Sequence, residues 1–201
     1  IINNTFAKKA VEKGADGLIA VAAGAGGHAG VKSPFALMQE LRQWFDGPIA
    51  LSGSIANGNS ILAAQAMGAD FAYMGSAFIA TEEARASDVY KQAIVDGTSD
   101  DVVYSNYFSG VYGNYLKTSI RNAGLDPENL PVNEEKTMNF SSGQAGKPKA
   151  WKDIWGSGHG IGAIDQVLST KQFVNKLHSE YVAARGRLGL ASTLVGAARD
   201  C

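Results

Sequence analysis

Short runs of consecutive apolar residues alternate with helix-forming segments over the first 95 residues of the chain. Three apolar runs, at 17–23, 48–52 and 71–74, are bounded by turn residues such as Gly and Asp. Runs of this length that are apolar throughout are typical of parallel strands buried on both faces. The segments between and after them carry helix formers, at 6–13, from Pro34 onward, at 60–67 and at 82–95. The pattern predicts an α/β fold of consecutive βα units around a parallel sheet.

The pattern changes after residue 95, which predicts three parts. Residues 1–95 hold the βα units. Residues 96–165 are predicted to form an irregular or helical inserted segment, which is irregular above all at 126–149, where Pro and Gly are frequent. Residues 166–201 contain an amphipathic helix at 171–187, whose apolar positions predict that it packs on the rest of the fold.

Two of the three predicted strands end in Gly followed by Ser. Gly53–Ser54 follows the second strand, and Gly75–Ser76 follows the third. Backbone N–H groups exposed at such turns can hold a phosphate. Two successive βα loops of this kind are similar to the phosphate site after strands 7 and 8 of a (β/α)8 barrel. The alternative is that both glycines only end their strands.

A glycine-rich loop with a histidine follows the first strand. Residues 24–29 fit the dinucleotide-binding pattern G-x-G-x-x-A, but the next strand ends at 51–53 without the acidic residue that would hold a ribose. We therefore interpret the loop as the carboxyl end of a barrel strand, where His28 faces a functional site. The glycines around it clear other side chains away, which favours function over a purely structural histidine.

The two other histidines have weaker signals. His159 lies in the glycine-rich stretch 156–162, which is either a second wall of a ligand site or a flexible turn. His178 lies between polar residues of the last predicted helix and is expected to face solvent. No cluster of His, Cys, Asp and Glu has the spacing of metal ligands, so a zinc or iron site is not expected.

Composition indicates an ordinary globular protein. The chain has 201 residues, 45% of them hydrophobic, a net charge of -1 and a pI of about 6.3, so nothing suggests a nucleic-acid partner. The single cysteine, Cys201, excludes an intrachain disulfide. The longest apolar run, 18–25, is too short to span a bilayer, and no signal peptide is evident. We expect a cytoplasmic protein without a membrane partner.

Three motifs, in this order, resemble the nitronate monooxygenase family, formerly called 2-nitropropane dioxygenases. They are Gly-Ala-Gly-Gly-His-Ala-Gly at 24–30, Ser-Gly-Ser-Ile-Ala-Asn-Gly at 52–58 and Met-Gly-Ser-Ala-Phe at 74–78, and segments 121–131 and 155–160 resemble the family's C-terminal region. The resemblance implies an FMN-dependent (β/α)8 TIM barrel. This chain would supply about the last three βα units and a C-terminal helical segment.

The resemblance also implies roles for the matching residues. His28 matches the family's catalytic histidine, and Ser157 and His159 are substrate-side candidates. The positions implied to bind FMN are Ala22, Gly26, Gly27, Ser52, Gly53, Ser54, Met74, Gly75 and Ser76. The chain departs from the pattern twice. Many members carry an acidic residue near the position of Gly24 and Ala25, and many have Gln where His159 stands.

The activity implied by the resemblance is the oxidation of alkyl nitronates, or of nitroalkanes, by O2 to a carbonyl compound and nitrite. The protein would then be a flavoprotein oxidoreductase that acts on a small molecule. Flavin-dependent enoyl-ACP reductases, which use NAD(P)H, share a similar Gly-Gly-His loop and phosphate site and are the first alternative. A catalytically silent, phosphate-binding barrel fragment is the second.

The three predicted strands need cover on both faces, whereas their own helices can cover only one. We therefore expect that an N-terminal segment with about five further strands, the missing half of the barrel, completes this fold. A homodimer is a further expectation.

Overall fold

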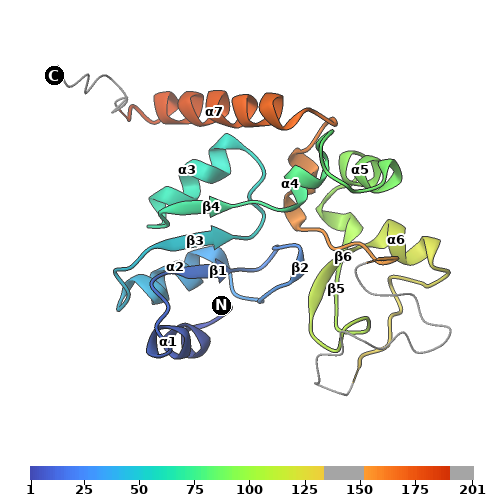
Figure 1. The fold of residues 1–201 in the computed structure, drawn as a ribbon, viewed down its shortest axis with the longest axis horizontal. Coiled ribbons are helices and arrows are strands. Elements are labelled where there is room, and N and C mark those ends of the chain that lie inside the picture. The colour runs from blue at the N-terminus through green and yellow to red at the C-terminus, as the bar shows by residue number, and fades with distance from the viewer. Residues whose placement is uncertain (134–151, 191–201) are drawn as a thin grey trace.

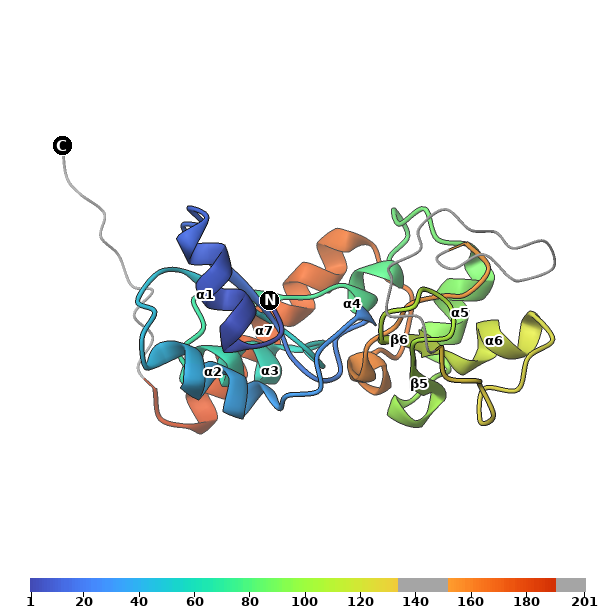
Figure 2. The same ribbon diagram turned by 90° about the horizontal axis from the view of Figure 1, so that it is seen from below.

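The structure is a computed structural model that describes residues 1–133 and 152–190 (Figures 1 and 2). Its helices are α1 (Asn4–Glu12), α2 (Pro34–Arg42), α3 (Gly58–Ala66), α4 (Ser76–Ile79), α5 (Asp88–Val95), α6 (Lys117–Asn122) and α7 (Thr170–Arg187), with short 3-10 turns η1 (Ser99–Asp101) and η2 (His159–Ala163). Its strands are β1 (Leu18–Val21), β2 (Gly27–His28), β3 (Ile49–Ser52), β4 (Phe71–Tyr73), β5 (Val102–Ser105) and β6 (Gly113–Leu116). Most of the stretch 126–149 and the end of the chain from 191 lie outside the described residues.

The predicted βα units form a three-stranded parallel sheet in the order β1-β3-β4. Ala20 pairs with Leu51, which pairs with Ala72, so these three side chains lie on one face. That face is the core, where the strands meet helices α1, α2 and α3 (Figures 1 and 2). Residues buried there include Ala7, Leu18, Ala20, Leu37, Met38, Leu41, Ile49, Leu51 and Ala64.

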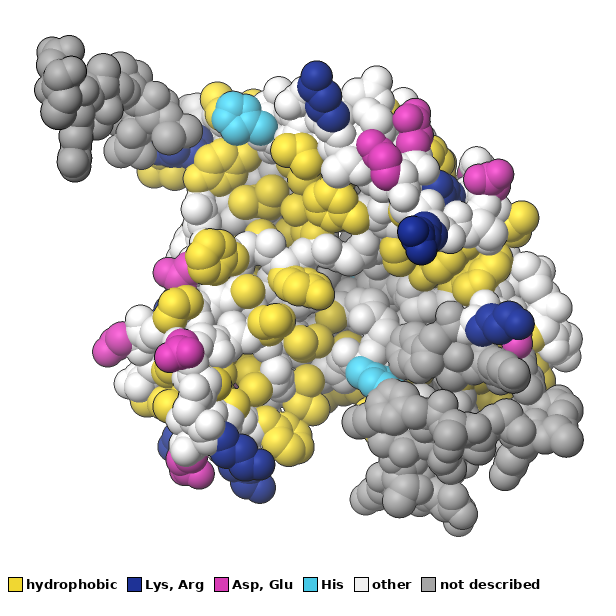
Figure 3. All heavy atoms as spheres, viewed as in Figure 1, with side chains coloured by type: hydrophobic (Ala, Val, Ile, Leu, Met, Phe, Trp, Pro, Cys, Tyr) yellow, Lys and Arg dark blue, Asp and Glu magenta, His cyan; other side chains and the backbone are white. Residues whose placement is uncertain are grey.

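The opposite face of the parallel sheet is exposed. Ile19 pairs with Ala50, which pairs with Phe71, and Tyr73 follows on the same face. The exposed fractions are 48% for Ile19, 63% for Phe71 and 53% for Tyr73. Hydrophobic side chains gather over the sheet on the face shown in Figure 3. The helices of these βα units therefore cover one face only, as expected from the apolar strands.

The helix starts differ from the predictions for local reasons. α1 begins at Asn4 rather than Phe6, because the side chain of Asn3 caps it by accepting from the backbone N–H of Phe6. α5 begins at Asp88 rather than Glu82, because the preceding segment pairs through its backbone with the chain just before α7. There the backbone N–H of Glu82 donates to the carbonyl of Leu168.

A second sheet, which was not predicted, joins the histidine loop to the segment after residue 95. Its order is β2-β6-β5, and all its pairs are antiparallel. The prediction that 96–165 is irregular or helical is therefore wrong for β5 and β6. Their sequences mix apolar, aromatic, small and polar residues and are joined by an aromatic-rich turn at 106–112, so no simple period marks them.

The last described helix, α7, packs on α3. Phe173 and Leu177 are buried, whereas His178 is exposed, as predicted. The backbones approach so closely at Gly58 that an added Cβ would lie 2.2 Å from the Tyr181 nitrogen. Glu180 Oε2 accepts from the Gly58 N–H at 2.8 Å, which joins α7 to the start of α3. Within residues 1–133 and 152–190, every helix is too short or too polar to be a membrane span.

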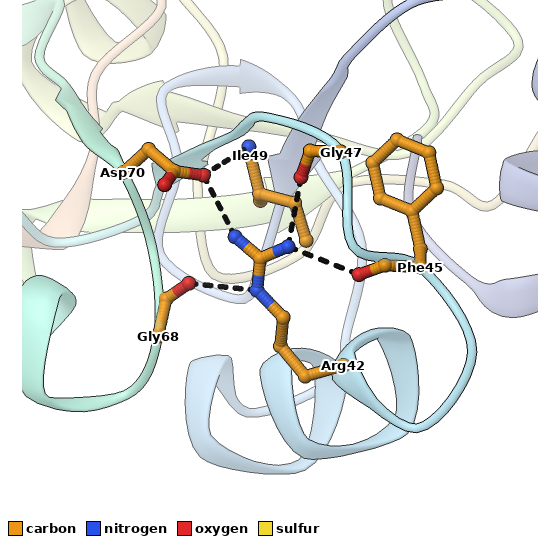
Figure 4. A network of polar contacts seen from close by, with 6 residues as sticks. All are labelled: Arg42, Phe45, Gly47, Ile49, Gly68 and Asp70. Carbon is orange, nitrogen blue, oxygen red and sulfur yellow. Dashed lines mark hydrogen bonds and ion pairs between the residues drawn. The ribbon is translucent and has the colours of Figure 1, made fainter.

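Arg42, at the end of α2, clamps the edge of the parallel sheet that lies opposite the glycine loops (Figure 4). Its Nη2 donates to Asp70 Oδ2 at 2.7 Å, and the same oxygen accepts from the N–H of Ile49 at 2.8 Å. These two contacts hold the pKa of Asp70 below its ordinary value of 3.8, the backbone N–H of Ile49 being the larger cause. The guanidinium also donates to three backbone carbonyls, those of Phe45, Gly47 and Gly68.

Replacement of Arg42 by Met should lower the free energy of unfolding by about 1–3 kcal/mol, since the substitution removes charge-assisted hydrogen bonds that several chain segments share. Urea unfolding followed by circular dichroism measures the change. Arg85→Met is the matched control, because Arg85 is exposed and surface substitutions have small effects. Equal unfolding midpoints for the two variants would contradict the clamp.

Candidate functional site

A small cavity of about 20 Å³ lies where β3 and β4 end. Its lining contains no acidic or basic side chain and consists of Gly24, Ala25, Ser52, Gly53, Ser54, Ile55, Ala56, Tyr73, Gly75, Ser76, Ala77, Gly158 and Gly160. The turn after β3 has an unusual backbone, with φ of 139° at Gly53 and 54° at Ser54. Serine rarely adopts the left-handed region, so the surrounding contacts determine this conformation.

A larger cavity of about 240 Å³ adjoins the small one and shares Gly75 and Ser76 with it. The remaining lining residues are Gly26, Gly27, Ile79, Tyr90, Trp155 and Gly156. The rings of Tyr90 and Trp155 are stacked, with centroids 4.7 Å apart. Tyr90 donates to the carbonyl of Gly156 at 2.5 Å, and burial raises its pKa to about 12. The lining of this cavity thus combines an aromatic pair with several glycines.

Two glycine loops meet backbone to backbone beside these cavities. A Cβ on Gly26 would lie 2.8 Å from the nitrogen of Gly158, and one on Gly158 would lie 2.5 Å from the carbonyl oxygen of Gly24. The backbone N–H of His159 donates to the Gly24 carbonyl at 3.0 Å. Only glycine permits such close approach of two chains. The loops 24–27 and 156–160 therefore form one surface.

Ser76 connects this surface to the end of β4. Its Oγ accepts from the N–H of Gly158 at 2.8 Å, which leaves the hydroxyl hydrogen to donate toward a ligand. Ser54, in contrast, uses its backbone N–H within the fold, where it donates to the Gly24 carbonyl at 3.3 Å.

Gly75 differs from Gly24, Gly26, Gly53, Gly158 and Gly160, where an added Cβ would lie within 3.1 Å of another atom. A Cβ built on Gly75 has no atom within 4 Å, although Gly75 lines both cavities. The missing side chain therefore leaves open space rather than relieving a clash. With Ser76 beside it and no carboxylate in the lining, this space fits an anion such as a phosphate.

His28 lies on β2, which pairs with β6 on the neighbouring hairpin. Its Nε2 is 2.8 Å from the Oγ of Ser109. The ring is partly buried, and this burial lowers the pKa of His28 below its ordinary value of 6.5, which favours the neutral imidazole at pH 7. His28 is not among the residues that line the two cavities, whereas the preceding Gly27 lines the larger one.

The structure brings most of the predicted site residues together. Ser52, Gly53, Ser54, Gly75 and Ser76 all line the small cavity, and Gly26 and Gly27 line the larger one.

Besides His28, four predicted positions do not line either cavity. Ala22 is fully buried in the core under the parallel sheet, and Met74 packs against the second core cluster. Ser157 is fully buried, and its N–H donates to the carbonyl of Asn114. His159 is exposed and lies between the cavity residues Gly158 and Gly160.

Sequence reasoning missed Ser109 and Asn114, which come from the unpredicted hairpin. Asn114 is buried, and its Nδ2 donates to the carbonyl of Ala25 at 2.7 Å, which ties the hairpin to the histidine loop. Ser109 is 81 residues from His28, and no local motif links the two. Within the described part of the chain, no group of three or more His, Cys, Asp or Glu side chains could hold a metal ion.

The nitronate monooxygenase family model matches residues 3–180. A Bacillus subtilis protein named probable nitronate monooxygenase is 27% identical over 183 residues, which cover 84% of this chain and 52% of that protein. The structure of a nitroalkane oxidase from Streptomyces ansochromogenes has a TM-score of 0.71 at 25% identity, covering 94% of this chain and 58% of that one. FabK from Thermotoga maritima has a TM-score of 0.72 at 23% identity, with 94% and 61% covered.

These similarities confirm the predicted fold class, a partial (β/α)8 barrel with a C-terminal helix. The chain spans about half the length of the curated relatives it matches.

Proposed function

Because the chain belongs to the nitronate monooxygenase family, whose model matches residues 3–180, we propose that it forms the cofactor-binding part of an FMN-dependent oxidoreductase that oxidises alkyl nitronates with O2. Two nitronate anions and one O2 would give two carbonyl compounds and two nitrite ions, so atoms and charge balance. The observation that carries the proposal is the open, uncharged space at Gly75, between the loop of the histidine and the ends of two parallel strands.

The cofactor phosphate would lie in the small cavity. Gly75 provides the space, the Ser76 hydroxyl can donate to an anion, and the turn at Gly53 and Ser54 forms the other side. When bound, the flavin would supply the redox chemistry. The larger cavity, with its Tyr90 and Trp155 wall, adjoins the phosphate position and offers room for the rest of the cofactor or for the substrate.

His28 would act on the substrate rather than on the cofactor. Its lowered pKa favours the neutral ring, which can accept the α-carbon proton of a neutral nitroalkane. A nitronate anion has already lost this proton, so it would need no base. The imidazole would then only orient the substrate or, when protonated, pair with its charge.

We further propose that other barrel strands cover the exposed sheet face formed by Ile19, Phe71 and Tyr73. Ile1 already follows the hydrogen-bond pattern of a parallel strand beside β1. Its terminal amino group donates to the Ile19 carbonyl at 2.6 Å, and its own carbonyl accepts from the N–H of Val21 at 2.8 Å. An apolar face and an open edge of this kind favour aggregation when they are left uncovered.

The native protein should accordingly have a mass well above the 21.1 kDa of this chain, because about five further strands would complete the barrel. Intact mass spectrometry of protein purified from its source measures this directly. A native mass of 21.1 kDa for a monomer that unfolds cooperatively would overturn the proposed cover.

Gly75→Val should weaken FMN binding without unfolding the protein. The new side chain would enter the open space, because an added Cβ on Gly75 has no atom within 4 Å. Crowding of this kind costs about 1–3 kcal/mol, or about 5- to 150-fold in Kd. Fluorescence titration with FMN measures the affinity, and thermal unfolding checks the fold. Gly186→Val makes the same change on α7, where an added Cβ also has no atom within 4 Å, and should leave both unchanged. Equal FMN affinity of the two variants would contradict the phosphate position.

His28→Ala should retain bound flavin but lower turnover of neutral nitroalkanes by about 10²–10⁴-fold, as expected for a lost general base. The loss on preformed nitronates should be smaller, because no proton has to be removed. Steady-state oxygen consumption with both substrates measures the difference. Equal rates for the variant and the parent would remove His28 from the mechanism. Rapid anaerobic bleaching of the flavin by NADH would instead favour a reductase.

A further inference from the structure

A buried serine on the β5–β6 hairpin contacts the imidazole of His28. We propose that Ser109 is a positioning residue for His28. The Ser109 hydroxyl oxygen accepts the hydrogen on Nε2 of His28 and so keeps the lone pair of the neutral ring on Nδ1. The proposal rests on the proposed catalytic role of His28 and identifies the nitrogen that would act as the base.

The direction of the hydrogen bond follows from counting hydrogens around the Ser109 hydroxyl. Its Oγ lies 2.9 Å from the Val111 carbonyl oxygen, which can only accept, so the single hydroxyl hydrogen points there. The contact with His28 Nε2 at 2.8 Å must then be a donation from the ring. The Tyr115 hydroxyl, at 3.3 Å, donates to the remaining lone pair. All three contacts are satisfied by this one arrangement.

The hairpin holds this serine rigidly. Ser109 is 2% exposed and lies in the turn between β5 and β6. β6 pairs with β2 at His28 itself, and the Tyr104 hydroxyl donates to the Ala29 carbonyl at 2.9 Å. The backbone pairing at His28 and the hydrogen bond at Ala29 thus fix the distance between His28 and Ser109.

The same pair could be read as a nucleophile and its base, since 2.8 Å is a typical distance for such pairs. The hydroxyl hydrogen, however, is committed to the Val111 carbonyl and not to the ring. Ser109 is also too deeply buried for a substrate to reach it. Its role is therefore to orient the ring.

The hairpin that carries Ser109 brings no charged side chain to the ring. Residues 102–116 contain no charged side chain, and their titratable groups are Tyr104, Tyr107, Tyr112 and Tyr115. Burial raises the pKa of Tyr104 and of Tyr115, so both stay neutral while the imidazole titrates. His159 is the titratable group on the loop that packs against 24–27. The Ser109 acceptor stabilises the imidazolium more than the neutral ring, because bonds from a charged donor are stronger.

The test is ¹⁵N NMR of the native protein labelled at histidine, with the His28 signals assigned by their loss in His28→Gln. The parent protein should show a protonated Nε2 in the neutral ring. Ser109→Ala should lower the pKa of His28 by about half a unit to one unit. It should also lower turnover of neutral nitroalkanes by about 10- to 100-fold, because the base is misplaced. Ser109→Cys fills the same space with a weak acceptor and should behave similarly if the alanine variant is unstable.

Ser105→Ala is the matched control. Ser105 is also buried on this hairpin, and its Oγ accepts from the Tyr107 N–H, so its removal costs a side-chain hydrogen bond of the same hairpin without touching His28. A protonated Nδ1 in the neutral parent ring would overturn the proposal. A His28 pKa in the Ser109 variants equal to that in Ser105→Ala would overturn it as well. The NMR result does not depend on turnover, so a parent protein without activity on nitronates would refute the proposed function alone.

Discussion

The contact of two backbones without intervening side chains determines the shape of the candidate site. An added Cβ on Gly26 would lie 2.8 Å from the backbone nitrogen of Gly158, and the N–H on this nitrogen donates to Ser76. Through this contact the histidine loop, the end of β4 and the late loop 156–160 form one wall. Both cavities border this wall, so their dimensions depend on the absence of side chains at these glycines.

At the opposite edge of the parallel sheet, a charged side chain rather than a glycine contact joins the chain segments. There Arg42 joins α2, the start of β3 and the turn before β4 by charge-assisted hydrogen bonds. In barrels of βα units, ligands bind at the carboxyl ends of strands, while the other end contributes stability. The same contrast between the two edges is present here: the edge with the candidate site is uncharged and glycine-rich, and the opposite edge carries the ion pair.

The sequence was sufficient to predict the parts of the fold that local pattern controls. Apolar runs located β1, β3 and β4, Pro34 marked the start of α2, and the glycine–serine pairs after β3 and β4 do line one cavity. The family suggested by the three motifs is confirmed. Contacts between distant segments could not be predicted in this way. The hairpin of β5 and β6 has no clear period, and the partnership of Ser109 with His28 exists only once that hairpin pairs with β2.

The glycine contact also bears on the order of folding. Gly26 and Gly158 are about 130 residues apart in the chain, and closing so long a loop is entropically costly and slow. The βα units that carry Gly53 and Gly75 are built from local contacts and can form earlier. A partly folded chain would therefore possess the sheet and its core while the wall at 156–160 was still absent. Ligand binding would then favour the last step of folding, because only the completed wall encloses the two cavities.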